Sequence, residues 1–295
     1  HSASVFRIIA HSYNRSWSTY LIIKVHQAIM ISYKDPNPQG MPTVVLLHGL
    51  GVNKQSWGYQ MDALINNNCR PIAIDIPGYG ESPKPKGVWK IGKVANSIMD
   101  LISRITQEPL FHIGLYLGGC ICLKIIIDKP QMIRGAILVN TFARLTNGGL
   151  IEYRYYLQRG LSLLIFGVEN QARIVAERVF PLPEQYFLRQ ATIETILQSD
   201  PGVYRQTMLE LVLMNFSPYL DRVTCPSLVV TGDQDTTLSR ASQYELVERI
   251  KKCRHVIIKD SGHATPIDQP DEFNRIMLDF MSGVVKQDRN SNHQA

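Results

Sequence analysis

The sequence predicts an α/β protein with a doubly wound, mostly parallel sheet of eight strands and an inserted helical lid. Short runs of β-branched residues and leucine alternate with segments whose apolar residues recur at helical spacing. Such alternation is typical of parallel sheets, because each parallel strand is reached by a crossover, usually a helix. One long helical stretch, residues 142–215, interrupts the alternation before the strand pattern resumes.

The elements before this stretch follow from two patterns. Residues 19–26 and 28–33 alternate apolar and polar side chains, which predicts an antiparallel opening pair. Residues 43–47 are continuously apolar, which suits a strand buried on both faces. The remaining predicted elements here are a helix at 57–65, a strand at 71–76, a helix at 94–105, a strand at 110–114, a helix at 117–127 and a strand at 136–140.

After residue 142 the β-branched runs give way to stretches rich in Leu, Tyr, Arg and Gln, broken by glycine and proline. Strands are predicted again at 227–231 and 255–259, and a last helix at 270–281. We therefore expect a core of residues 19–141 and 216–284, a helical lid at 142–215, and flexible ends at 1–18 and 285–295. Two interpretations stay open for the aromatic lid residues: they form the lid's own core, which is favoured, or they line an apolar pocket. These residues are Tyr153, Tyr155, Tyr156 and Phe166.

Composition narrows the classes of function. With 295 residues, 45% of them hydrophobic and 19% charged, the chain can bury a core without disulfide or metal staples. The five cysteines form no C-x-x-C pair and no cluster with histidine, so we expect reduced thiols, no metal site and a cytoplasmic location.

Charge and hydropathy exclude some kinds of binding partner. The net charge of +6 comes from scattered basic residues without interleaved aromatics, which argues against a nucleic-acid partner. No apolar run is long enough to cross a bilayer, and residues 1–20 lack the pattern of a signal peptide. We expect a small-molecule substrate or ligand; the oligomeric state does not follow from periodicity.

Residues suited to chemistry follow the predicted strands, at the sheet edge where ligands bind in α/β proteins. They are the run His48-Gly49-Leu50-Gly51, the run D-I-P-G-Y-G-E-S at 75–82, the glycine-flanked corner at 114–119, Asp235 in Gly-Asp-Gln-Asp, and His263 in Ser-Gly-His. Together these motifs, in this order, resemble the α/β-hydrolase superfamily over residues 19–280. The resemblance implies hydrolysis of a small ester, lactone, amide or C–C bond without a cofactor.

The resemblance also implies roles for single residues. His263 would be the general base and Asp235 would hold its ring in the useful tautomer. The backbone amides of Leu50 and Leu117 would form an oxyanion hole, the second of them at a helix N-terminus. Alone, the aspartate reads as a turn residue and the histidine as a plain loop residue; their order within the chain favours the catalytic interpretation.

A tyrosine stands at the nucleophile position. The G-x-S-x-G pattern of the superfamily aligns with Gly114-Leu115-Tyr116-Leu117-Gly118, and no shift of register places serine or cysteine at its centre. The glycines still permit the sharp strand-to-helix turn, with a strain of about 1–3 kcal/mol at its apex. A phenol oxygen lies at the far end of a rigid ring, so it would overshoot the point where the imidazole and the amides converge. We conclude that ordinary acyl-serine chemistry is absent.

Other candidates near this corner are interpreted as structural. Asp75 is expected to be a turn residue, and Cys120 to be helix packing rather than a substitute nucleophile. Ser82 and Ser261 lie in loops that lack the geometry of the corner, and Trp57 either borders the pocket or packs in the core.

Three functions remain open from the sequence. The first is a hydrolase in which His263 and Asp235 activate water directly, or in which Tyr116 has a new role. The second is a catalytically dead binding or signalling protein that keeps the pocket. The third is a serine enzyme in which Tyr116 is a variant, an inactivating change or a sequence error.

Overall fold

The computed structural model describes residues 31–145 and 150–292. Its described residues form one sheet in the order β1-β3-β2-β4-β5-β6-β7. The strands are β1 (Tyr33–Lys34), β2 (Thr43–Leu47), β3 (Arg70–Ile74), β4 (Leu110–Leu115), β5 (Ile133–Val139), β6 (Ser227–Gly232) and β7 (Cys253–Ile258). Only β1 is antiparallel to its neighbour, and every other pair in this described sheet is parallel. The prediction of a mostly parallel α/β sheet is confirmed.

The predicted number of eight strands differs from the seven that the described residues form. The difference arises at the start of the chain, where an antiparallel pair was expected. Residues 19–26 and 28–30 lie outside the described residues, and β1 is a two-residue strand that pairs with β3.

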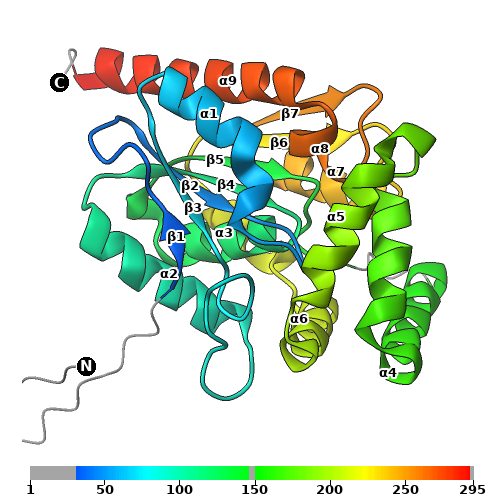
Figure 1. Ribbon diagram of the computed structural model, residues 1–295. Helices are drawn as coiled ribbons and strands as arrows, with labels where there is room; N and C mark the ends of the chain where they lie inside the picture. The colour runs from blue at the N-terminus through cyan, green and yellow to red at the C-terminus, as the bar shows by residue number, and fades with distance from the viewer. Residues whose placement is uncertain (1–30, 146–149, 293–295) are drawn as a thin grey trace, which may run out of the picture.

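Helices cover both faces of the sheet (Figure 1). On one face lie α1 (Gly58–Asn66) and α9 (Pro270–Asn292), and on the other lie α2 (Ile91–Ile105) and α3 (Leu117–Asp128). Two shorter helices, α7 (Arg240–Arg249) and α8 (Thr265–Asp268), follow β6 and β7. Helix α9 buries Val284 and continues from there through the predicted tail as far as Asn292, and the flexibility of residues 285–292 stays a prediction.

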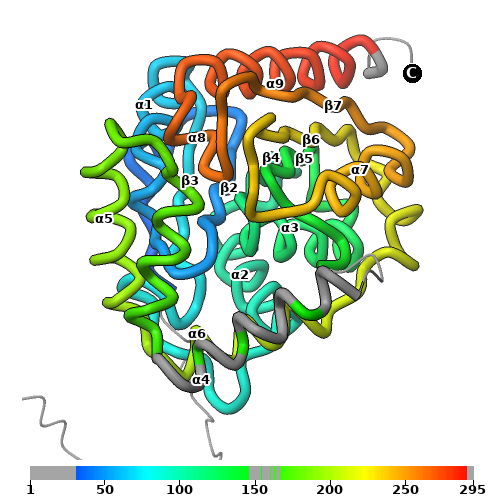
Figure 2. The backbone as a smooth tube through the Cα atoms, turned by 90° about the vertical axis from the view of Figure 1, so that its right-hand side faces the viewer, coloured from blue at the N-terminus to red at the C-terminus, as the bar shows by residue number. Residues whose placement is uncertain are grey.

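Residues 142–215 contain no strand among those described and hold α4 (Leu150–Val179), α5 (Tyr186–Leu197) and α6 (Pro201–Leu213). These three helices stand together at one end of the sheet (Figures 1 and 2). The two ends of the segment meet, since the Phe216 N–H donates to the Ala143 carbonyl oxygen at 2.9 Å. Helix α4 is broken at Gly167, where φ is 74°. The side chains of Tyr153, Tyr155, Tyr156 and Phe166 are outside the described part of the structure.

The core is built from the two periodicities that the sequence shows. All residues of β2 are buried, as expected for a strand covered on both faces. Helix α2 buries one stripe at spacings of three and four residues, formed by Ile91, Val94, Ala95, Ile98, Met99 and Ile102. Trp57 is 1% exposed and packs in this core, which settles its role between pocket wall and packing.

Helix α3 begins unusually close to the sheet. A Cβ atom added to Gly118 would lie 2.0 Å from the Leu47 carbonyl oxygen, and one added to Gly114 would lie 2.4 Å from the backbone of Gly118. No side chain fits between these backbones. The glycines of the corner are therefore required by packing, as well as by the sharpness of the turn.

This packing gives a first prediction. Gly118→Ala is expected to lower the free energy of unfolding by about 3 kcal/mol, because the β2 or α3 backbone must move to admit the methyl group. Gly283→Ala is the control, since a Cβ there meets nothing within 4 Å and a helical alanine stabilises by about 0.5–1 kcal/mol. Urea unfolding of both variants measures the difference. Equal stability of Gly118→Ala and the parent would contradict the close approach.

Candidate active site

The corner between β4 and α3 places Tyr116 at its apex. Its backbone has φ 49° and ψ −105°, a left-handed conformation that is strained for any residue with a side chain. The strain is held from the end of β5: the Tyr116 N–H donates to the Val139 oxygen at 3.0 Å, and the Thr141 hydroxyl donates to the Tyr116 oxygen at 2.7 Å. The chain thus has the turn of a nucleophile elbow with a tyrosine at its centre.

Asp235 and His263 come together from the loops that follow β6 and β7. His263 Nδ1 lies 3.0 Å from Asp235 Oδ2, and the two side chains are only 8% and 1% exposed. The Asp235 carboxylate also accepts the backbone N–H groups of Thr237 at 2.7 Å and Leu238 at 3.3 Å. Since every partner of this carboxylate is a donor, the proton of the neutral imidazole belongs on Nδ1. This leaves Nε2 as the nitrogen that can accept a proton.

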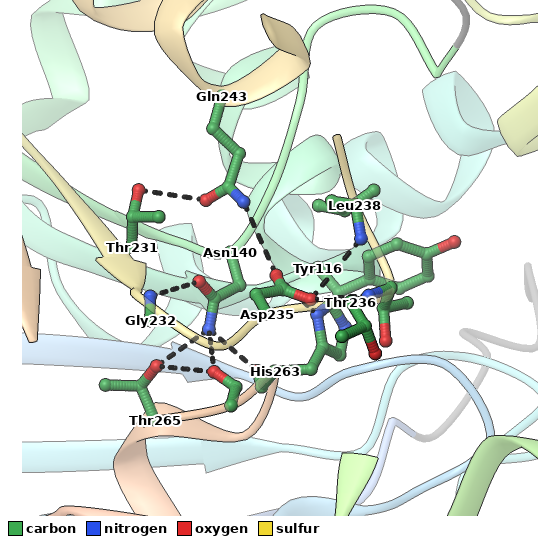
Figure 3. A network of polar contacts seen from close by, with 12 residues as sticks. Tyr116, Asn140, Thr231, Gly232, Asp235, Thr236, Leu238, Gln243, His263 and Thr265 are labelled. Carbon is green, nitrogen blue, oxygen red and sulfur yellow. Dashed lines mark hydrogen bonds and ion pairs between the residues drawn. The ribbon is translucent and has the colours of Figure 1, made fainter. Parts of the chain in front are cut away.

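The ring of Tyr116 lies against this pair. Its centroid is 5.0 Å from that of the His263 ring, in an edge-to-face arrangement, and 5.5 Å from that of Phe142. In Figure 3 the tyrosine hydroxyl is at the end of the ring that is turned away from Asp235 and His263. The structure therefore brings together all three residues of the predicted site, with aromatic carbon rather than an oxygen of Tyr116 next to the imidazole.

The two predicted oxyanion amides occupy different positions. Leu50 follows β2, next to Gly51 with its φ of 78°, and lines the cavity described below. Leu117 is the first residue of α3, so its N–H has no carbonyl partner within the helix. Among the described residues Leu117 does not line that cavity, whereas Tyr116 does. The oxyanion role of both amides stays a prediction.

The Leu50 loop is held by His48, which is completely buried. The Ile76 N–H donates to His48 Nε2 at 3.0 Å, so the ring proton is on Nδ1 and is donated to the Gly49 oxygen at 2.8 Å. Burial lowers the pKa of His48 to about 4, against a smaller opposing effect of the Gly49 bond. A neutral histidine therefore fixes the loop at neutral pH.

A cavity of about 80 Å³ lies beside His263. Its walls are mostly apolar and come from both the core and the helical segment; they include Leu50, Leu115, Tyr116, Val179, Phe180 and His263. Arg178 is the one residue with a permanent charge among the described lining residues, and it donates to the Thr236 oxygen. Burial lowers the pKa of Arg178, while the charge of Asp235 acts in the opposite direction. This volume is below the roughly 300–1,000 Å³ common for ligand pockets, and the ring of Tyr116 forms part of the wall.

Cys120, interpreted from the sequence as helix packing, is packed in the core. Cys120 is buried, its sulfur lies 3.4 Å from the Thr141 hydroxyl, and burial raises the pKa of this thiol to about 12. A thiol with that pKa holds almost no thiolate at neutral pH and is not a substitute nucleophile. All five cysteines are free, as expected.

Asp75 and the two serines also hold loops together. Asp75 is fully buried and pairs with the Lys54 ammonium group at 2.6 Å. The Ser82 hydroxyl donates to the Asp75 carbonyl oxygen at 2.6 Å, and the Ser261 hydroxyl donates to Asp268 at 2.8 Å. The prediction that Asp75 is structural agrees with these contacts.

Sequence reasoning missed two polar residues at the site. Asn140 follows β5 and bonds to the loops that carry Asp235 and His263, and Gln243 on α7 lies 3.4 Å from Asp235 Oδ2. Asn140 could have been found, because it is a polar residue at the carboxyl end of a buried strand. Gln243 gave no such signal, since only folding brings α7 beside the loop.

Two further findings concern other kinds of site. Within residues 31–145 and 150–292, no group of three or more histidine, cysteine or acidic side chains is arranged to hold a metal ion. No helix in that part of the chain combines the length and apolar character needed to cross a membrane.

The parallel sheet, the strained elbow after β4, and the acid and histidine after β6 and β7 define an α/β hydrolase. The family model for serine aminopeptidase, S33, matches residues 38–270, and the chain belongs to this family. The relatives include a putative carbamate hydrolase RutD from Variovorax paradoxus, 24% identical, over 86% of this chain and 97% of the relative. A 3-oxoadipate enol-lactonase 2 from Acinetobacter baylyi is 23% identical over 84% and 91% of the two chains.

Solved structures agree with the fold. The crystal structure of an enol-lactonase from Burkholderia xenovorans superimposes with a TM-score of 0.77 at 22% identity, over 85% of this chain and 96% of that one. At this identity the likeness establishes the architecture, while the chemistry depends on the residues of the site.

Proposed function

We propose that the chain is a cofactor-free hydrolase of a small ester, lactone or related bond, with Asp235 and His263 as its acid–base pair and with turnover limited by Tyr116. The observation that carries this proposal is the 3.0 Å bond between two buried side chains beside a cavity. Holding Nδ1 on a carboxylate aims Nε2 at substrate or water, which is the task of a general base. The names of the relatives, a carbamate hydrolase and an enol-lactonase, support a small substrate.

Tyr116 limits this chemistry in two ways. Its ring forms part of the wall where an acyl group would bind, and it brings no hydroxymethyl oxygen to the imidazole. Attack by water activated at His263 is the route that the remaining groups support. We assign a lid role to α4, α5 and α6, because each of them contributes a residue to the cavity wall: Val179 on α4, Ile196 on α5 and Tyr204 on α6. The five free thiols support a cytoplasmic location.

A binding protein without turnover is the second candidate. The observation in its favour is the size and polarity of the cavity, about 80 Å³ with mostly apolar walls, one of them the tyrosine ring itself. Such a pocket suits a small apolar ligand and offers little room for a tetrahedral intermediate.

One comparison separates the two candidates. The parent chain is assayed on p-nitrophenyl acetate beside His263→Ala and the control His255→Ala, a histidine on β7 whose Nε2 contacts Thr231 rather than the cavity. We expect slow parent turnover that falls about 10²-fold in His263→Ala, the contribution typical of a general base, and is kept in His255→Ala. Equal rates in the parent and His263→Ala would exclude the hydrolase proposal and leave the binding protein.

A further inference from the structure

Asn140 lies at the centre of the site without touching the cavity. It follows β5 directly, is fully buried, and has a φ of 40°, which is rare for a residue with a side chain. Its backbone N–H donates to the Val230 oxygen at 2.9 Å, so its position is fixed relative to β6. A buried residue in a strained conformation at this edge requires a physical reason.

The side-chain amide joins the two loops of the site. Its Oδ1 accepts the Gly232 N–H at 2.9 Å, and its Nδ2 donates to the His263 carbonyl oxygen at 2.8 Å and to the Thr265 hydroxyl at 2.7 Å (Figure 3). The orientation of the amide is determined, because a flipped group would set its oxygen against the His263 oxygen. The oxygen of the amide therefore holds the loop of Asp235, and its nitrogen holds the loop of His263.

These contacts to the backbone fix the positions of Asp235 and His263 themselves. Gly232 begins the turn that carries the acid, since the Asp235 N–H donates to the Gly232 oxygen at 3.2 Å. The two loops also touch each other: a Cβ added to Gly232 would lie 2.1 Å from the Gly262 oxygen. The Gln234 N–H also donates to the Ser261 oxygen at 2.9 Å, so the loops are in direct contact, and the amide adds a bond to each of them close to the acid and the base.

We propose that Asn140 is a positioning residue that fixes the distance and orientation between Asp235 and His263, and that it does so by bonding to both backbones at once. This inference rests on the proposed function of that pair. It assigns to a neutral amide a task that neither alanine nor aspartate can perform. Alanine removes the side-chain partner of the buried Gly232 N–H and of the His263 carbonyl oxygen, and an ionised aspartate turns an oxygen toward the His263 carbonyl.

The first readout is proton NMR of the His263 Nδ1–H, which the bond to Asp235 shifts downfield and protects from exchange. It needs no turnover, and His263→Ala assigns the signal. We expect the signal in the parent and its loss or marked shift in Asn140→Ala and Asn140→Asp. The matched control is Gln60→Ala, which removes another buried amide that joins α1 to the Pro266 oxygen without contacting Asp235 or His263.

The second readout is the rate in a Tyr116→Ser background, where we expect Asn140→Ala to lower kcat about 10- to 10²-fold while KM stays nearly constant, since displaced catalytic groups act on the chemical step. If Asn140→Ala does not fold, Asn140→Asp carries the same comparison, because it keeps the shape and the Gly232 bond.

The outcomes are distinguishable. A parent signal that persists in the Asn140 variants, or is lost equally in Gln60→Ala, overturns the positioning role and leaves the proposed function standing. A parent without the signal contradicts the pairing of Asp235 with His263, and both proposals fall with it.

Discussion

Tyr116→Ser is expected to raise the turnover of p-nitrophenyl acetate on the order of 10³-fold above the parent. The backbone that a nucleophilic serine needs is already formed, with φ 49° at the apex and both the amide and the carbonyl of residue 116 bonded to the end of β5. A hydroxymethyl group there would replace the ring that now lies 5.0 Å from the His263 ring. Removing the phenol also enlarges the cavity for an acyl group.

Two controls separate the new oxygen from the new space. Tyr116→Ala opens the cavity without supplying a nucleophile, and it is expected to stay near the parent rate. Tyr116→Ser combined with His263→Ala is expected to lose most of the gain. A fluorophosphonate should label only the serine variant that keeps His263. Equal gains for serine and alanine would show that volume alone limits turnover, and no gain for serine would contradict the placement of the acid–base pair.

Acid is expected to destabilise the fold through two buried histidines. His112 on β4 is completely buried, and neither of its ring nitrogens has a hydrogen-bond partner among the described residues, so burial lowers its pKa to about 3. The pKa of His48 is lowered to about 4. Above pH 6.5 both residues are neutral in the folded and unfolded states and contribute nothing. Below pH 6.5 the unfolded chain binds protons that the folded chain cannot, so the free energy of unfolding falls by about 1.4 kcal/mol per pH unit for each histidine.

His112→Leu tests this effect at one of the two histidines. It is the cleaner substitution, because the His112 ring makes no hydrogen bond among the described residues that leucine would lose. At pH 5 the variant should retain about 2 kcal/mol more of its free energy of unfolding, relative to the parent, than it does at pH 7.5. Urea unfolding at the two pH values measures this difference. A stability difference that does not change with pH would mean that His112 is protonated or solvated in the folded state.

Much of the fold followed from the sequence because its signals are local. Continuous apolar runs predicted β2 and β5, helical spacing predicted α2 and α3, and the order of glycine-rich corners predicted which strand ends meet. These features depend on residues close together in the chain, where alternation and turn chemistry act. The end of α9 shows what such local patterns cannot predict. Its last residues are polar, and a polar helix terminus has a composition similar to that of a flexible tail.

The mostly parallel sheet, the elbow and the residue at its apex could all be predicted from the sequence. Three features became known from the folded chain: the tyrosine ring packs edge to face on His263, the cavity beside it is small, and Asn140 joins the loops of Asp235 and His263. These facts depend on distances between segments about a hundred residues apart in the chain. No periodicity records such distances, because they are set by how closely the backbones of neighbouring strands and loops can pack.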